Sequence, residues 1–222
     1  MTKQAMGNDY KDEQEKIKGH RKAAEQGDAA AQFYLGLCYE DGKGVAKDEQ
    51  EAVKWYRKAA EQGDAEAQLS LGTCYGTGTG VAQDMQEAIK WFRKAAEQGD
   101  ADAQHNLGVC YLHGRGIAKD IQEGVNWYRK AAEQGNAAAQ YYLGVCYSNG
   151  TGVAKDEQEA VKWYRKAAEQ GLADAQYALG VYYLNGVGAA LGMQEAARWF
   201  RKAAKQGDAN AIKALSVLDQ TL

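Results

Sequence analysis

The stretch Arg-Lys-Ala-Ala-Glu-Gln-Gly, residues 21–27, decides the fold of this chain. It returns every 36 residues, beginning at Arg57, Arg93, Arg129 and Arg165, and once more at Arg201 with Lys205 in place of the glutamate. A fixed period of this size is typical of arrays in which each unit contacts only its neighbours. The sequence therefore predicts a repeat protein of 222 residues.

Each repeat contains the signals of two short helices. In the first repeat, Asp28 is suited to cap a helix start, and Ala31, Leu35 and Tyr39 then recur at a spacing of four, which indicates one apolar helical stripe. Gly42 is suited to end that helix because glycine readily adopts a left-handed backbone. The absence of proline in the whole chain agrees with uninterrupted helices.

The second helix of the repeat begins at Asp48, and Glu51 three residues later completes a capping-box pattern. Its buried face is expected at Ala52, Trp55, Tyr56, Ala59 and Ala60. In the fifth repeat, Leu172 and Gly192 replace the capping aspartates of the two helices, so we expect weaker helix starts there. One such pair of helices is too small to bury its own apolar face, so stacking must supply the core.

These signals divide the chain into a flexible tail, a capping helix, five full repeats and a terminal half-repeat. Residues 1–8 form the tail and residues 9–27 the N-terminal cap, in which Gly19 stands where later copies have tryptophan. The repeats are 28–63, 64–99, 100–135, 136–171 and 172–207. Residues 208–222 form the C-terminal capping half-repeat.

Composition excludes several classes of function. A formal net charge of −3 gives no basic surface for nucleic acid, and no apolar run approaches the roughly 20 residues that span a bilayer. Residues 1–16 lack the apolar core of a secretory signal. We therefore expect a cytoplasmic protein, although removal of a secretion signal would leave the same sequence.

The cysteines share one repeat position, occupied by Cys38, Cys74, Cys110 and Cys146, with Tyr182 in the fifth repeat. Equivalent atoms of stacked repeats lie about 10 Å apart, whereas a disulfide requires Cα atoms within about 7 Å. The same spacing argues against metal binding, and no C-x-x-C pair is present. We predict free, buried thiols.

The repeat resembles the Sel-1-like repeat, a relative of the tetratricopeptide repeat with a longer, glycine-marked loop between its helices. Two motifs carry the resemblance: Ala31-Gln32-x-x-Leu35-Gly36-x-x-Tyr39 and Ala52-x-x-Trp55-Tyr56-x-x-Ala59-Ala60. The resemblance extends from residue 12 to about residue 218. It implies an all-α fold, a right-handed α/α superhelical solenoid that acts as a protein-interaction adaptor.

By resemblance to tetratricopeptide arrays, the first helices line a concave groove, and ligand-facing residues fall at positions 33, 37, 40 and 41 and their equivalents. These positions vary most among the repeats and are rich in aromatic, amide and imidazole side chains, which suits a groove that binds an extended peptide. The alternative explanation is drift of the sequence on a solvated surface. The candidate partner-binding residues are Phe33, Asp41, His105, His113, Tyr141, Asn149, Tyr177 and Asn185. Because Tyr141 and Tyr177 lie outside the recurring apolar set, we expect their truncation to spare folding.

Catalytic and cofactor chemistry finds little support. Each Gly-x-Gly follows a helix rather than a strand, unlike a dinucleotide fingerprint, and His105 and His113 lie about 12 Å apart along a helix, too far to share a metal. We expect no cofactor and no metal. The leading hypothesis is a non-catalytic adaptor for a peptide or protein segment; the alternatives are a structural spacer between flanking domains and, with least support, a hydrolase.

Overall fold

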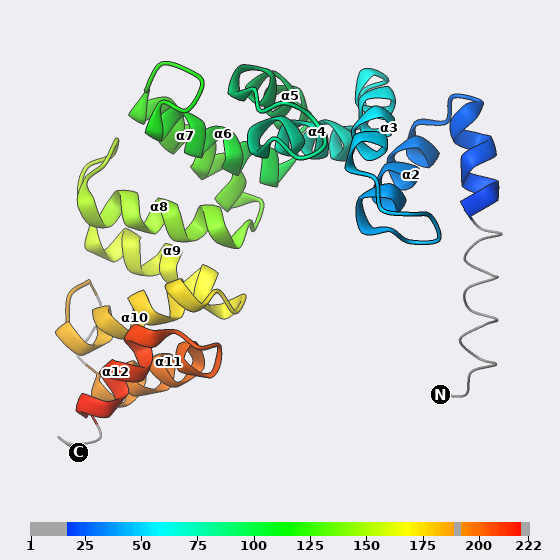
Figure 1. Cartoon of the computed structure of the whole chain (residues 1–222). Coiled ribbons are helices and arrows are strands. Elements are labelled where there is room, and N and C mark those ends of the chain that lie inside the picture. The colour runs from blue at the N-terminus through cyan, green and yellow to red at the C-terminus, as the bar shows by residue number, and fades with distance from the viewer. Residues whose placement is uncertain (1–16, 189–191, 219–222) are drawn as a thin grey trace, which may run out of the picture. The chain divides into compact units, whose positions relative to one another are not determined.

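The computed structural model describes residues 17–188 and 192–218, which form helices joined by turns (Figure 1). No strand occurs within this part of the chain. Residues 17–25 are helical, and the helices that follow are α2 (Ala29–Asp41), α3 (Glu49–Glu61), α4 (Ala65–Thr77), α5 (Met85–Glu97), α6 (Ala101–His113), α7 (Ile121–Glu133), α8 (Ala137–Asn149), α9 (Glu157–Glu169), α10 (Ala173–Asn185), α11 (Met193–Lys205) and α12 (Ala209–Leu218). The predicted tail and residues 9–16 of the predicted N-terminal cap lie outside the described residues.

The helices alternate between the two types that the sequence predicted, so the all-α solenoid is confirmed. We call the first helix of each repeat helix A (α2, α4, α6, α8 and α10) and the second helix B (α3, α5, α7, α9 and α11). The chain divides into two compact units, one up to Ala103 with Arg115–Ile117, the other comprising Gln104–Gly114 and Ala118 onward.

The predicted caps explain where the helices begin and end. The Asp28 carboxylate accepts a hydrogen bond from the backbone N–H of Ala31 at 2.7 Å, and Gly42 ends α2 in the left-handed conformation with φ 71°. Asp48 accepts from the N–H groups of Gln50 and Glu51, both at 3.0 Å. The carboxylate of Glu51 pairs with a lysine one turn on rather than returning to the cap, so the capping box is half formed.

The fifth repeat lacks these side-chain caps, as its sequence predicted. Neither Leu172, which precedes α10, nor Gly192, which precedes α11, makes a side-chain capping bond. The backbone of both residues is nonetheless extended, as at the other helix starts. Stacking contacts thus fix these helix starts without the stabilisation of about 1 kcal/mol that a capping side chain provides.

The hydrophobic core lies mainly between consecutive repeats. One cluster joins Val53, Tyr56 and Ala60 of α3 to Leu71 and Cys74 of α4, the next helix in the chain. The leucine of every helix A is fully buried: Leu35, Leu71, Leu107, Leu143 and Leu179. The arrangement confirms that a single helix pair does not bury its own apolar face.

Two glycines show how closely the elements approach. A Cβ atom on Gly36 would lie 2.5 Å from the Tyr56 ring, so this position of helix A accepts no side chain without movement of the ring. Gly80, in the loop after α4, has φ +66°, and a Cβ there would lie 2.1 Å from the carbonyl oxygen of Glu49. The recurring glycine of this loop therefore lets the backbone of one repeat rest on the helix B start of the repeat before it.

A ladder of buried glutamines also links the repeats, and our sequence analysis did not predict it. Gln68 is buried, its side-chain amide donates to the backbone carbonyl of Ala60 at 3.0 Å, and its oxygen accepts from Gln98 at 2.8 Å. The equivalent pairs are Gln32 with Gln62, Gln104 with Gln134, Gln140 with Gln170, and Gln176 with Gln206. In four of these pairs the buried glutamine, Gln32, Gln68, Gln140 or Gln176, also donates to a backbone carbonyl at a helix end that stacking removes from water.

The tryptophans of helix B are less buried than the sequence indicated. Trp127 and Trp199 are buried at 9% and 7% exposure, but Trp55, Trp91 and Trp163 are only half-buried. A lysine one turn later covers each ring, and in the third repeat the Lys130 ammonium lies 3.9 Å from the Trp127 ring centre. A cation–π contact thus closes the outer edge of the core.

All four cysteines are free and buried, as predicted. Burial raises the pKa of the thiols of Cys74 and Cys146 to about 11. Within residues 17–188 and 192–218, no helix is long and apolar enough to cross a membrane. The same residues contain no cluster of three or more His, Cys, Asp or Glu side chains that is arranged to hold a metal ion.

Candidate binding surface on the A helices

The predicted aromatic position of helix A lies partly inside the core. Phe33, His105, Tyr141 and Tyr177 are all half-buried. Each ring lies against the aromatic residue of helix B in its own repeat, with centroid separations of 5.6–5.7 Å. The expectation that truncation of these rings would spare folding is therefore wrong, because one side of each ring packs on the core while the other remains accessible.

The four predicted polar residues are exposed at the ends of A helices. Asp41, His113, Asn149 and Asn185 are the last residues of α2, α6, α8 and α10. Their side chains do not behave alike, since Asp41 forms an ion pair with Lys43 at 2.5 Å. That pair neutralises part of the charge that the sequence analysis assigned to partner binding.

The second unit carries a continuous group of aromatic rings over α6, α7 and α8. Tyr142 is 42% exposed, and its ring lies near those of His105 and Tyr128, with centroids 5.7 and 5.6 Å apart and interplanar angles of 29° and 17°. Tyr141 then meets Tyr142 edge-on at 5.2 Å. Tyr142 was not among the residues selected from the sequence, yet it is the most exposed ring of the group.

Electrostatics at these rings favour a neutral phenol. Burial, and next the negative charge of Asp174, raise the pKa of Tyr141. Asp174 lies in the first turn of α10, and its side chain is exposed. The surface around Tyr141 thus combines an aromatic face with a nearby carboxylate, a combination that suits a hydrogen-bond donor or a cation.

The first unit carries a small polar recess between α2 and α4, with a volume of about 190 Å³. Glu40, Leu69, Ser70, Thr73, Cys74, Thr77 and Thr79 line it. Four of these residues, Glu40, Leu69, Thr73 and Thr77, occupy the four repeat positions that the sequence analysis mapped as ligand-facing. The residues of this region that the sequence predicted, Phe33 and Asp41, do not line the recess. The signal that was missed is the set of hydroxyl residues in α4, Ser70, Thr73 and Thr77.

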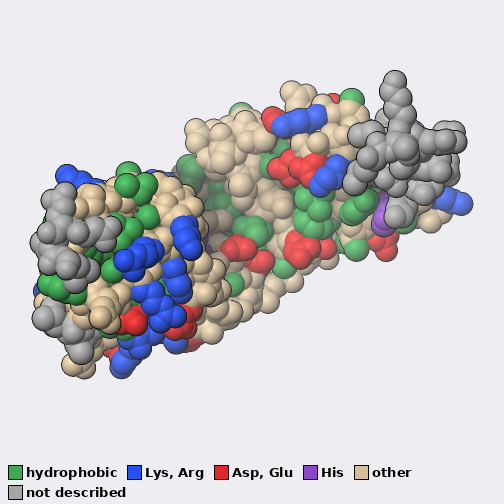
Figure 2. Space-filling model, turned by 90° about the horizontal axis from the view of Figure 1, so that it is seen from below, with side chains coloured by type: hydrophobic (Ala, Val, Ile, Leu, Met, Phe, Trp, Pro, Cys, Tyr) green, Lys and Arg blue, Asp and Glu red, His purple; other side chains and the backbone are tan. Residues whose placement is uncertain are grey.

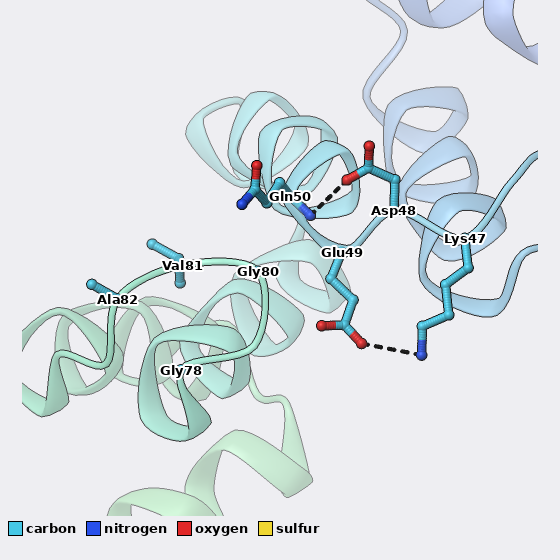
Figure 3. A pocket seen from close by; sticks show the side chains of 8 residues that line it. All are labelled: Lys47, Asp48, Glu49, Gln50, Gly78, Gly80, Val81 and Ala82. Carbon is cyan, nitrogen blue, oxygen red and sulfur yellow. Dashed lines mark hydrogen bonds and ion pairs between the residues drawn. The ribbon is translucent and has the colours of Figure 1, made fainter.

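A larger recess of about 730 Å³ lies at the start of α3, opposite the loop Gly78–Ala82 (Figure 3). Its charges are satisfied internally: Lys47 pairs with Glu49 at 3.1 Å, and Asp48 caps the helix. A similar recess recurs at Lys155–Gln158 beside Gly188. Because it recurs at one repeat position, it belongs to the way the repeats stack rather than to a specific ligand.

The surface charge differs along the chain. In the view of Figure 2, Asp and Glu side chains gather beside hydrophobic ones on the N-terminal repeats. Lys and Arg side chains gather on the visible face of the C-terminal repeats. Each part therefore presents its own charge pattern on this face.

Helix pairs at a period of 36 residues, with a glycine-marked loop and a core between repeats, define an α-helical solenoid repeat protein. The Sel1 repeat family matches residues 29–64, 65–100, 101–136, 137–172 and 173–208. The chain belongs to the Sel1 repeat family. Its repeat boundaries are displaced by one residue from those that we assigned from the sequence.

Solved structures agree with this assignment. A Sel1 repeat protein from Oxalobacter formigenes is 44% identical over 86% of this chain and 78% of that protein, with a TM-score of 0.82. The c5321 protein, a protective antigen of uropathogenic Escherichia coli with an SLR fold, is 35% identical over 93% of this chain and 52% of that protein, with a TM-score of 0.66. The immunity protein Pa5087 of Pseudomonas aeruginosa, 24% identical over 91% of this chain and 73% of that protein with a TM-score of 0.53, shares the fold. No curated protein matches the chain.

Proteins of the Sel1 repeat family are generally protein-interaction scaffolds and are generally not enzymes. The family thus gives the class of function. The residues that contact a partner, and the partner itself, must be inferred from the surface of this chain.

Proposed function

We propose that this protein is a non-catalytic adaptor that binds an extended segment of a partner protein along its A helices. The observation that carries the proposal is the contrast between the two kinds of position in the repeat. The buried leucine, glycine and glutamine of helix A are the same in all five repeats, whereas the accessible positions vary among the repeats. Positions that stacking does not constrain are available for contact with a partner.

The side chains at the accessible positions favour a peptide-binding surface over a surface that contacts only water. Half-buried rings such as Tyr141 and Tyr177 are held by packing against helix B, so they offer contact area at a small loss of conformational entropy. Exposed amides such as Asn149 can both donate to and accept from a peptide backbone. The four free cysteines agree with a reducing compartment, so we infer a cytoplasmic location.

Two alternatives remain distinct from this proposal. A structural spacer would need only the stacking residues, and its accessible positions would be free to drift. A hydrolase would need a nucleophile with a base within hydrogen-bonding reach. The rings on α6 and α8 favour the adaptor, because drift alone does not gather large aromatic side chains on an exposed face.

The proposal is tested by selecting peptide ligands from a random library and titrating them calorimetrically into variants of the full chain. Tyr142→Ala should weaken binding by roughly 1–3 kcal/mol, the range of an interface anchor, and Asn149→Ala by a smaller amount. The matched control is Lys162→Ala on α9, where Lys162 is exposed and pairs only with Glu159. Normal binding by both helix A variants together with weakened binding by the control would reject the A-helix surface.

A further inference from the structure

The recess between α2 and α4 differs from every equivalent place in the other repeats. Glu40 is replaced at its repeat position by Gly76, Leu112, Ser148 and Leu184. Thr73 is replaced by leucine in the first repeat and by valine in the other three. A feature that occurs once in five repeats is not required for stacking, so its polar side chains need another explanation.

Two hydroxyl groups of α4, those of Thr73 and Thr77, leave acceptors rather than donors facing the recess. Thr73 donates its proton to the carbonyl oxygen of Leu69 at 3.0 Å, and Thr77 donates to that of Thr73 at 2.9 Å. The hydroxyl oxygens of Thr77 and Thr79 lie 2.8 Å apart. Because the helix backbone takes the protons of Thr73 and Thr77, the oxygen of Thr73 in particular presents lone pairs to a ligand.

The carboxylate of Glu40 adds a negative charge to these acceptors. One of its oxygens accepts a hydrogen bond from the hydroxyl of Tyr56, which fixes the side chain at the rim of the recess. The lysines that follow α2 are engaged with other acids, Lys43 with Asp41 and Lys47 with Glu49. No lysine or arginine lines the recess in the described part of the chain.

The charge of Glu40 reaches the floor of the recess. Burial raises the pKa of the Cys74 thiol to about 11, and the negative charge of Glu40 is the next cause of that shift. A thiol in such surroundings stays protonated and unreactive, so Cys74 contributes a soft apolar floor rather than a nucleophile. Leu69 adds a second apolar wall.

We propose that this recess binds the guanidinium group of an arginine side chain in the partner segment. A volume of about 190 Å³ suits the end of one long side chain. The Glu40 carboxylate and the hydroxyl oxygens match a group with five N–H donors and no acceptor, while Leu69 and Cys74 pack against its methylene stem. The inference rests on the proposed function, because it assigns one residue of the segment that the A helices bind.

The test uses ¹⁵N-labelled full chain and the blocked peptide Gly-Gly-Arg-Gly-Gly, observed by NMR titration. We expect millimolar binding with shifts confined to amides of α2 and α4, weakened by added salt because the pair is ionic. The same peptide with citrulline, which keeps the shape of arginine without its charge, should cause at least a tenfold smaller effect. No binding by the arginine peptide, or equal binding by both peptides, would overturn the inference.

Two variants localise the binding. Glu40→Gln should reduce affinity at least tenfold, and Thr73→Val several-fold; valine at Val109, Val145 and Val181 shows that the scaffold accepts this side chain. Glu61→Gln, which removes an exposed carboxylate at the end of α3, is the matched control and should leave affinity unchanged. Unchanged affinity in Glu40→Gln would reject the recess as the arginine site.

The two proposals fail separately. If selected peptides lose affinity in Tyr142→Ala but bind Glu40→Gln normally, the A helices bind a segment and the arginine assignment is wrong. If the arginine peptide binds in a Glu40-dependent manner while Tyr142→Ala leaves the binding of selected peptides unchanged, the arginine site is supported and the extended binding surface on the A helices is rejected.

Discussion

Single residues at one repeat position acquire their chemistry from stacking. Cys74 and Cys146 are buried between repeats, and this burial raises the pKa of each thiol to about 11, against about 8.5 in an unfolded chain. The protonated thiol is therefore favoured by folding. All four thiols are buried, and none of them forms a disulfide.

The raised pKa values predict how stability depends on pH. Between the unfolded and folded pKa values the unfolded thiol loses its proton and the folded one keeps it, so the stabilisation present below about pH 8.5 is lost as pH rises toward 11. Between pH 8 and pH 10, the free energy of unfolding measured with urea should fall more for the wild type than for the double variant Cys74→Ala, Cys146→Ala. The difference should be on the order of 1 kcal/mol per thiol.

The control for this prediction is the reactivity of the cysteines toward a thiol reagent. At pH 8 the native protein should react slowly with a thiol reagent, and all four cysteines should react once it is unfolded in urea. Rapid reaction of Cys74 or Cys146 in the native state would show that burial does not control these thiols.

At the scale of the helices, the buried glutamines stabilise the junctions between repeats. Gln68→Ala should lower the free energy of unfolding by roughly 1–3 kcal/mol, because it leaves the carbonyl of Ala60 without its partner in a junction that excludes water and also removes the hydrogen bond from the exposed Gln98. Gln86→Ala is the matched control, since Gln86 is exposed near the start of α5. Chemical denaturation curves that show equal loss in the two variants would contradict the role of the ladder.

The helices could be predicted from the sequence more fully than the contacts of individual side chains. Caps such as Asp28 and Asp48, and helix ends such as Gly42, act within a few residues, so the sequence contains their whole explanation. The partner of Gln68 lies 30 residues away at the end of the other helix of the same repeat, and only the packing of these two helices brings Gln98 within reach. Periodicity identified a glutamine at each repeat but not what it binds.

The same contrast between local signals and contacts distant in sequence applies to the candidate surface. The repeat comparison separated invariant positions from variable ones, yet it placed Tyr141 and Tyr177 wholly outside the packing. Their rings lie against Tyr164 and Phe200, a contact set by how helix A crosses helix B. The recess beside Glu40 needed the structure for a similar reason, because its acceptors come from two helices of different repeats.

In the proposed function, the buried positions of each repeat serve stacking, and the A helices present their accessible positions to a partner. The most direct test is photo-crosslinking of a selected peptide that carries a benzophenone side chain, followed by identification of the linked residues by mass spectrometry. The account predicts crosslinks on A helices, including residues near Tyr142 and Asn149 of α8. Crosslinks confined to the exposed side of B helices, such as Lys162 or Glu169 of α9, would contradict it.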